Sequence, residues 1–323
     1  MGRWITGWLL LAWVLTVQAA NPQLVQLGDY DFALYANADL AAPTLPIRHA
    51  VILIHGVRRN AADYFDSGSQ LLGNAGLSAS DTLLMAPHFL TDADTDEPSA
   101  IPRWAAGQWL HGSPSYSGVP AFNVLDDLLA LLADRQRFPE LKDVLLVGHS
   151  AGGQLVQRYA IFNNSDQRLN KQGIALRYGV ASPSSYLYFD SQRWHNGQLQ
   201  TDPPPTCPGF NRYRYGLDNL PAYAAEQRLT AKQWFRRYAQ RQVIYLVGSD
   251  DNNPEARVMD RSCPAQLQGP TRRQRQENYL AYEQQLAKRW GFALHHSHVL
   301  IDGIGHRPSE LLTAPATAKA LFP

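Results

Sequence analysis

Short, largely apolar runs bounded by turn residues recur along the chain. They cover residues 50–54, 82–85, 144–147, 174–180, 243–247 and 293–301. Because strands covered on both faces have few polar positions, such runs are typical of the inner strands of a parallel sheet. Two earlier segments, 23–27 and 30–35, are joined by Gly28 and Asp29 and predict an opening β-hairpin.

Segments with helical periodicity lie between these runs. One contains apolar residues at the spacing of a single helix face: Phe122, Leu125, Leu128, Leu129 and Leu132. Residues 154–162 and 309–321 also suit helices. Strands that alternate with helices predict an α/β fold, with a mostly parallel central sheet and helices on both faces.

Two long segments interrupt this alternation. Residues 91–120 are rich in Pro, Gly, Asp and Trp, and we expect a long loop over the active face. Residues 182–240 contain Pro203, Pro204 and Pro205 and many aromatic residues. Because loops of this length in a compact domain are usually functional or disordered, we expect a cap inserted after the sixth core strand, at about residues 182–240.

The first residues predict a signal peptide over 1–19. Arg3 supplies the positive start, residues 8–17 an apolar core, and residues 17–19 a cleavage site with small side chains. The mature domain is then 20–323, secreted or periplasmic. The apolar stretch is short for a bilayer, although an uncleaved anchor is an alternative. We find no other candidate span, so we expect no stable membrane insertion after cleavage.

Charge and cysteine content narrow the function classes. With 29 Lys and Arg against 28 Asp and Glu, the net charge of +1 gives no support to nucleic-acid binding. The basic run 272–275 is expected to be a solvated helix start. Two cysteines in an exported chain suggest one disulfide, Cys207 to Cys263, with two unpaired thiols as the alternative. Neither cysteine has another Cys or a His nearby at the spacing of metal ligands, so no bound metal is expected.

The sequence Gly-His-Ser-Ala-Gly at 148–152 carries the strongest chemical signal. It follows an apolar strand and precedes a helical segment, which is the setting of a G-x-S-x-G nucleophile turn. The turn must be sharp for the Ser150 hydroxyl to project from the sheet, and bulky residues at 148 or 152 would collide with neighbouring backbone. Ser150 is therefore the predicted nucleophile.

A serine hydroxyl needs a base, and the base needs an acid that orients it. Asp251 follows the strand at 243–247 and is the predicted acid, with the adjacent Asp250 as the alternative. His306 lies in a glycine-bearing loop after the last strand and is the predicted base. The other candidates within that strand, His295, His296 and His298, are expected to face solvent or a neighbour.

The turn at Ser150, the order Ser150, Asp251, His306 and the sequence Leu-Ile-His-Gly at 53–56 resemble the α/β-hydrolase superfamily over residues 48–323. The resemblance implies an oxyanion hole made by the backbone N–H groups of Val57 and Ala151, with Arg58 as the alternative to Val57. It implies no metal and no organic cofactor.

Aromatic residues in the two long segments are candidates for substrate contact, because they combine large contact area with a polar tip. The residues assigned are Trp104, Trp109, Tyr186 and Tyr213. An equally weighted interpretation is that they pack the cap onto the body.

These observations predict a secreted serine hydrolase, most simply a carboxylic-ester hydrolase that forms an acyl-enzyme. Its partner would be a small-molecule or polymer ester. A serine peptidase or acyltransferase on the same fold is the alternative, because the triad alone does not separate these reactions. A secreted binding protein without turnover is a more remote one.

Overall fold

The computed structural model describes residues 22–95, 100–195, 197–201 and 207–323. The predicted signal peptide at 1–19 lies outside these described residues. The central sheet has eight strands in the order β1-β2-β4-β3-β7-β8-β11-β12. Strands β1 and β2 pair antiparallel, β2 runs antiparallel to β4, and the pairs from β4 to β12 are parallel. The predicted α/β fold with a mostly parallel sheet is confirmed.

The strands follow the apolar runs closely. Their bounds are β1 Gln23–Leu27, β2 Tyr30–Ala36, β3 His49–Ile54, β4 Thr82–Pro87, β7 Asp143–His149, β8 Ala175–Ala181, β11 Gln242–Gly248 and β12 His296–Ile301. Strands β3, β4, β7 and β11 are buried along almost their whole length, which explains their unbroken apolar sequences. The last strand begins later than predicted, at His296 instead of residue 293.

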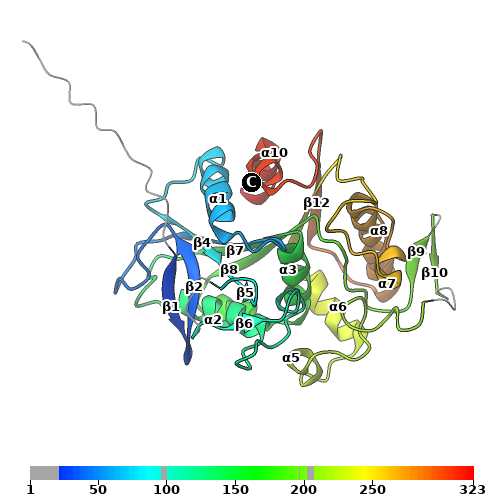
Figure 1. Ribbon diagram of the computed structural model, residues 1–323, viewed down its shortest axis with the longest axis horizontal. Helices are drawn as coiled ribbons and strands as arrows, with labels where there is room; N and C mark the ends of the chain where they lie inside the picture. Colours follow the sequence, from blue (N-terminus) through cyan, green and yellow to red (C-terminus); the bar gives the residue numbers. More distant parts are fainter. Residues whose placement is uncertain (1–21, 96–99, 196, 202–206) are drawn as a thin grey trace, which may run out of the picture.

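Helices cover both faces of the sheet (Figure 1). On one face lie α1 Ala61–Asn74, α9 Pro308–Thr313 and α10 Pro315–Leu321, which share a core cluster with the strands. On the other lie α2 Ala121–Leu132, α3 Ala151–Phe162, α6 Ala231–Ala239 and α8 Arg272–Trp290. Shorter helices are α4 Ser165–Lys171, α5 Ala222–Ala225 and α7 Cys263–Gln266.

The closing helix differs from the prediction for 309–321. It is divided into α9 and α10, and Ala314 between them has an extended backbone with ψ 137°. The cause is Pro315, because the ring of a proline disfavours helical backbone at the residue before it. Pro315 itself then starts α10, where its missing N–H costs nothing.

The two long segments contain short elements. The first carries β5 Leu90–Thr91, β6 Arg103–Trp104 and the 3₁₀ turn Trp109–His111. The second carries the small hairpin β9 Arg193–His195 and β10 Gln198–Gln200, followed by α5 and α6. Helix α6 packs against α3, and β9 packs against α8. The cap role of 182–240 stays a prediction.

The predicted disulfide is present. Cys207, in the inserted segment, is bonded to Cys263 at the start of α7. The bond closes a loop with a sequence separation of 56.

Within the described ranges, no helix has both the length and the apolar character that a bilayer-spanning helix requires.

Candidate active site

Ser150 occupies a strained turn between β7 and α3. Its backbone has φ 58° and ψ −114°, a conformation that non-glycine residues rarely adopt. The turn is held by a hydrogen bond from the Ser150 N–H to the carbonyl oxygen of Ala181 at the end of β8, at 2.8 Å. Strain of this kind persists only where surrounding structure enforces it, and it places the hydroxyl beyond the end of the strand.

Neighbouring glycines make the turn possible. A Cβ atom at Gly148 would lie 2.2 Å from the carbonyl oxygen of Gly152, and one at Gly152 would lie 2.4 Å from that of Ile54. Both contacts are with backbone atoms, which cannot move aside as a flexible side chain could. The sequence expectation that larger residues at 148 and 152 would collide agrees with these contacts.

Backbone contacts between two loops bring Asp251 and His306 together. The loop after β11 donates from the Asp250 N–H to the carbonyl oxygen of Ile304 at 2.9 Å. Gly248 lies so close to this second loop that a Cβ atom would be 2.0 Å from the same oxygen. Since β11 and β12 are adjacent and parallel, their loops emerge at the same edge of the sheet as Ser150.

The three side chains form a continuous hydrogen-bonded chain. Nε2 of His306 lies 3.0 Å from Oγ of Ser150, and Nδ1 of His306 lies 2.7 Å from Oδ2 of Asp251. The adjacent Asp250 instead accepts from the Ser249 hydroxyl at 3.0 Å. The structure therefore brings Asp251 to the imidazole, rather than the alternative Asp250.

A buried arginine completes this arrangement and was missed in the sequence. The Arg272 side chain is 0% exposed, and its Nη1 donates to Oδ1 of Asp251 at 3.2 Å. Its Nε donates to Oγ of Ser184 at 3.2 Å and its Nη2 to the carbonyl oxygen of Val258 at 3.1 Å. The expectation of a solvated helix start is thus wrong for Arg272 and Arg275, which are both buried against the loops that α8 supports.

The charges around the imidazole set its protonation. Burial raises the pKa of Asp251, but the hydrogen bond and charge of His306 and the guanidinium of Arg272 outweigh burial and hold this pKa below its usual range. Burial lowers the pKa of His306, the bond to Asp251 opposes this, and Arg272 lowers it further. His306 is therefore neutral near pH 7, as a base must be.

His149, next to Ser150 in the sequence, is a buried neutral neighbour. Its Nδ1 lies 2.7 Å from the Tyr64 hydroxyl, and its ring packs on that of His306 with centroids 4.7 Å apart. Burial, with the charges of His306 and Arg272, holds the pKa of His149 well below 6.5. This packing supports the imidazole of His306 from one side.

Two hollows of about 180 Å³ each are lined by Ser150. We call the first the polar hollow; its lining includes Gln108, His111, Gln154, Ser184, Arg214 and Asp260. We call the second the apolar hollow; its lining includes Gly56, Arg58, Tyr64, His149, Val258, His306, Arg307 and Pro308. Val57 lines both, and Ala151 lines the polar hollow. The assignment of their N–H groups to an oxyanion hole stays a prediction.

The four aromatic residues expected to contact substrate are not among the described residues that line either hollow. Trp104 and Trp109 are fully buried around Phe89, and Tyr186 is buried and stacked on Tyr279. Tyr213 packs against the main core cluster. The structure favours the alternative interpretation, in which these rings hold the long segments onto the body.

Among the described residues, no group of three or more His, Cys, Asp or Glu side chains is arranged to hold a metal ion.

Comparison with known proteins agrees with this architecture. The sequence pattern of the Alpha/beta hydrolase family matches residues 51–317. The structure is similar to LpqC, poly(3-hydroxybutyrate) depolymerase from Bordetella parapertussis, at 22% identity, with 92% of this chain and 88% of that one covered and a TM-score of 0.62. It is also similar to poly(aspartic acid) hydrolase-1 from Sphingomonas sp. KT-1, at 17% identity, with 94% and 99% covered and a TM-score of 0.65.

At these identities the structural likeness shows the fold alone. No curated protein matches the chain in sequence. The family match spans most of the chain and includes the sheet from β3 onward, the turn at Ser150 and the loops of Asp251 and His306, while β1 and β2 precede it. The chain belongs to the alpha/beta hydrolase family.

Proposed function

We propose that the protein is a secreted serine hydrolase that cleaves carboxylic esters through an acyl-enzyme. Ser150 is the nucleophile, His306 the general base and acid, and Asp251 the group that orients His306. The observation that carries the proposal is the hydrogen-bonded chain from Ser150 through His306 to Asp251, with distances of 3.0 and 2.7 Å. Neutral His306, oriented with Nδ1 toward a carboxylate, leaves Nε2 free to accept the serine proton.

The reaction then has two steps. Oγ of Ser150 bonds to the acyl carbon while His306 takes its proton, and His306 passes this proton to the leaving alcohol as the ester bond breaks. Water next loses a proton to His306 and attacks the acyl carbon. As the bond from the acyl carbon to Oγ breaks and the acid leaves, His306 returns the proton to Oγ and restores Ser150. The N–H groups of Val57 and Ala151 are proposed to stabilise the oxyanion in both steps, an effect typically worth about 3 to 4 kcal/mol per donor.

The substrate class proposed is a small-molecule or polymer ester. The similar structures include a poly(3-hydroxybutyrate) depolymerase and a poly(aspartic acid) hydrolase, and the site lies in open hollows at the surface. Export to the periplasm or the exterior is supported by the leader-like pattern at 1–19 and by the disulfide from Cys207 to Cys263, a bond typical of oxidising compartments.

Covalent labelling tests the proposal. A fluorophosphonate probe and a panel of p-nitrophenyl esters are applied to the wild type, Ser150→Ala and the matched control Ser80→Ala, whose side chain lies in an exposed turn. We expect labelling and ester turnover in the wild type and Ser80→Ala, and neither in Ser150→Ala. Equal labelling of the wild type and Ser150→Ala would remove Ser150 from its role. Turnover of aminoacyl amides without turnover of esters would favour a peptidase instead.

A further inference from the structure

The position of His306 assigns the two hollows at Ser150 to different parts of an ester substrate. If the site works as proposed above, His306 Nε2 gives its proton to the leaving alcohol, so the alcohol must lie on the side of Ser150 that His306 lines. That side is the apolar hollow. The acyl chain then occupies the other side, the polar hollow, whose described lining does not include His306.

Arg214 is the charged donor of the polar hollow. Its Nε donates to the Tyr215 hydroxyl at 2.9 Å, its Nη1 contacts Nε2 of His111, and its Nη2 lies 3.6 Å from Oδ2 of Asp260. The side chain is 35% exposed, so these contacts fix the guanidinium while part of it faces the hollow. A guanidinium carries five N–H donors, and these contacts leave donors on Nη1 and Nη2 for a ligand.

Asp260, which also lines the polar hollow, is ionised and offsets one of its positive charges. Its carboxylate accepts from the Tyr215 hydroxyl at 2.8 Å and from the Ser262 N–H at 3.0 Å, in addition to its contact with Arg214. Burial raises its pKa, but the bonds from Ser262 and Tyr215 and the charge of Arg214 outweigh burial and keep the carboxylate ionised.

Two further guanidinium groups lie behind the lining without a carboxylate partner. Arg158 is fully buried and donates to neutral acceptors: the carbonyl oxygens of Leu110 and Arg214, the Gln154 side chain and the Ser185 hydroxyl. Arg275 is also fully buried and donates to the carbonyl oxygens of Gly269 and Ser184. In the described part of the chain, neither forms a salt bridge.

The region around the polar hollow is therefore electropositive. Four arginines, Arg158, Arg214, Arg272 and Arg275, lie in or behind its lining, together with two aspartates, Asp251 and Asp260, which pair with Arg272 and Arg214. The whole chain has a net charge of only +1, so this excess is local. Buried cations without counter-ions are costly, and a cleft of one sign attracts ligands of the other.

From this geometry we propose that the acyl part of the substrate carries a carboxylate, which binds Arg214 in the polar hollow. The substrate class is a monoester of a short dicarboxylic acid, or a polymer end with the same chemistry. The proposal rests on the proposed function and adds the specificity-determining residue.

The test compares two nearly isosteric esters, monomethyl glutarate, which is an anion, and its neutral amide analogue methyl 4-carbamoylbutanoate. Release of methanol is measured for the wild type, Arg214→Gln and Arg214→Lys. We expect the wild type to prefer the anion in kcat/KM by about tenfold or more, the typical value of one charge-assisted hydrogen bond. Arg214→Gln should lose this preference, read as the ratio of kcat/KM for the two esters, and Arg214→Lys should keep part of it.

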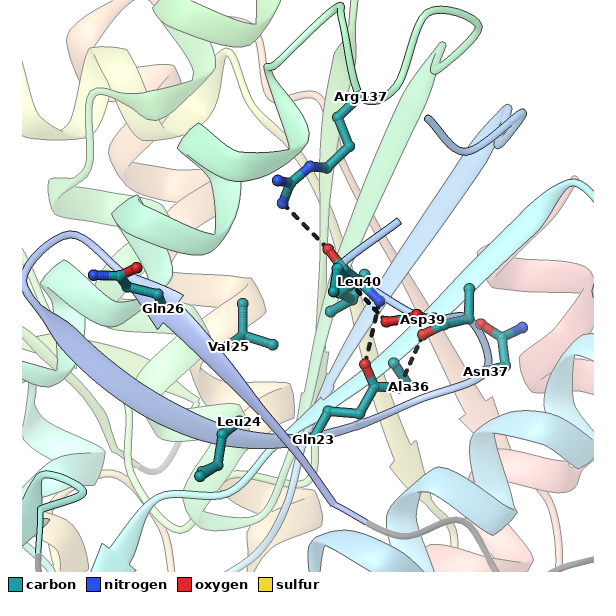
Figure 2. A pocket seen from close by; sticks show the side chains of 11 residues that line it. Gln23, Leu24, Val25, Gln26, Ala36, Asn37, Asp39, Leu40 and Arg137 are labelled. Carbon is teal, nitrogen blue, oxygen red and sulfur yellow. Dashed lines mark hydrogen bonds between the residues drawn. The ribbon is translucent and has the colours of Figure 1, made fainter. Parts of the chain in front are cut away.

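The control variant is Arg137→Gln. Arg137 lines a separate hollow beside β1, where its guanidinium points to the carbonyl oxygen of Leu40 (Figure 2). This variant should leave the rates on both esters unchanged. Added salt should reduce the wild-type preference for the anion, which checks the charge effect without any variant.

The outcomes separate the two proposals. Equal wild-type rates on both esters, with turnover that still requires Ser150, would overturn the carboxylate site and leave the proposed function standing. A preference that survives in Arg214→Gln would also overturn it. Absence of turnover on both esters, together with absence of fluorophosphonate labelling at Ser150, would overturn both.

Discussion

Two pairs among the described residues each join a histidine to a buried carboxylate, with similar distances but opposite shifts in the histidine pKa. His306 lies 2.7 Å from Asp251 at the edge of the sheet, and His296 lies 3.0 Å from Glu283 between β12 and α8. Both carboxylates are almost fully buried. The pKa of His306 is lowered and that of His296 is raised, so a carboxylate neighbour alone does not decide the protonation of an imidazole.

The group at the second ring nitrogen makes the first difference. Nε2 of His296 lies 2.9 Å from the carbonyl oxygen of Tyr238, which can only accept a hydrogen bond. Both nitrogens of His296 must therefore donate, and the ring is charged. Nε2 of His306 faces the Ser150 hydroxyl, which can donate, so this nitrogen can stay without a proton.

The second difference lies behind the carboxylate. Glu283 accepts from the neutral Tyr245 hydroxyl at 2.9 Å, and its full charge acts on His296. Asp251 is shared with the cation Arg272, which offsets its pull on the proton of His306. Burial lowers the pKa of both imidazoles, and the bond and charge of Glu283 overcome burial where those of Asp251 do not. The comparison shows how the fold favours a neutral imidazole in one pair, as the proposed base requires, and a charged imidazole in the other.

The largest expected effect concerns His306, the proposed base. His306→Ala should reduce kcat/KM for an ester by about 10⁴-fold or more, as loss of a triad member does in serine hydrolases. The melting temperature should change little, because the His306 side chain is 22% exposed and lies in a loop. Steady-state kinetics and thermal unfolding check both parts. Retention of more than about a tenth of the activity would contradict the role of His306.

His296→Ala should give the reverse pattern. It leaves Glu283 buried without its cationic partner, and breaking a buried pair in this way costs about 3 to 5 kcal/mol of unfolding free energy. The specific activity of the folded fraction should stay near that of the wild type. Urea unfolding measures the loss, and the control is His298→Ala on the same strand, where the side chain is exposed. Equal stability of the two variants would rule out a charged pair at 296.

Arg272→Met tests whether the guanidinium of Arg272 orients Asp251 and lowers the pKa of His306. Without the guanidinium, Asp251 loses an orienting bond, and we expect kcat/KM to fall about tenfold or more because small displacements in a site are costly. The pKa of His306 should also rise, so the acidic limb of the pH–rate profile, expected below pH 6.5 in the wild type, should move to higher pH. The adjacent Arg273→Met, which removes a more exposed cation, is the control. A tenfold loss with an unmoved acidic limb would leave Arg272 a purely structural role.

The smallest expected effect is the pH dependence of stability. The pKa of His296 is raised in the folded state. The contribution of His296 to the free energy of unfolding is therefore fully present below its pKa in the unfolded chain, about 6.5, and is lost as the pH rises through its pKa in the folded protein. A tenfold difference in proton affinity between the folded and unfolded states corresponds to about 1.4 kcal/mol of unfolding free energy. Urea unfolding of the wild type between pH 6 and 9 should show this loss, and His296→Ala should not. Parallel curves for the two proteins would refute it.

Much of the fold was predictable because buried parallel strands have a simple sequence pattern. The runs at 50–54, 82–85, 144–147 and 243–247 each became a strand of the central sheet. Helix α1 was not predicted: Ala61, Tyr64, Phe65, Leu71 and Leu72 do recur at helical spacing and are buried, but small residues, Ser67 and Gly68, stand between them on the buried face, and the segment also contains Ser69 and Gly73. Its burial against β4 and α9 is a tertiary effect.

The site was predictable only where one local turn or loop carries the signal. Ser150, Asp251 and His306 each follow a strand, and the structure brings them together. Arg272 gave no such signal: it lies in a basic run, and only the packing of α8 shows that it is buried against Asp251. The polar hollow is built from several separate segments, so neither its shape nor the role of Arg214 could be inferred from any one of them.

Nuclear magnetic resonance of protein labelled with ¹⁵N in the histidine rings tests the central claim most directly. Signals are assigned with His306→Ala and His296→Ala, and ring protonation is recorded near pH 7. We predict one unprotonated nitrogen, Nε2, for His306 and two protonated nitrogens for His296. A doubly protonated His306, or a His296 with one bare nitrogen, would contradict the account.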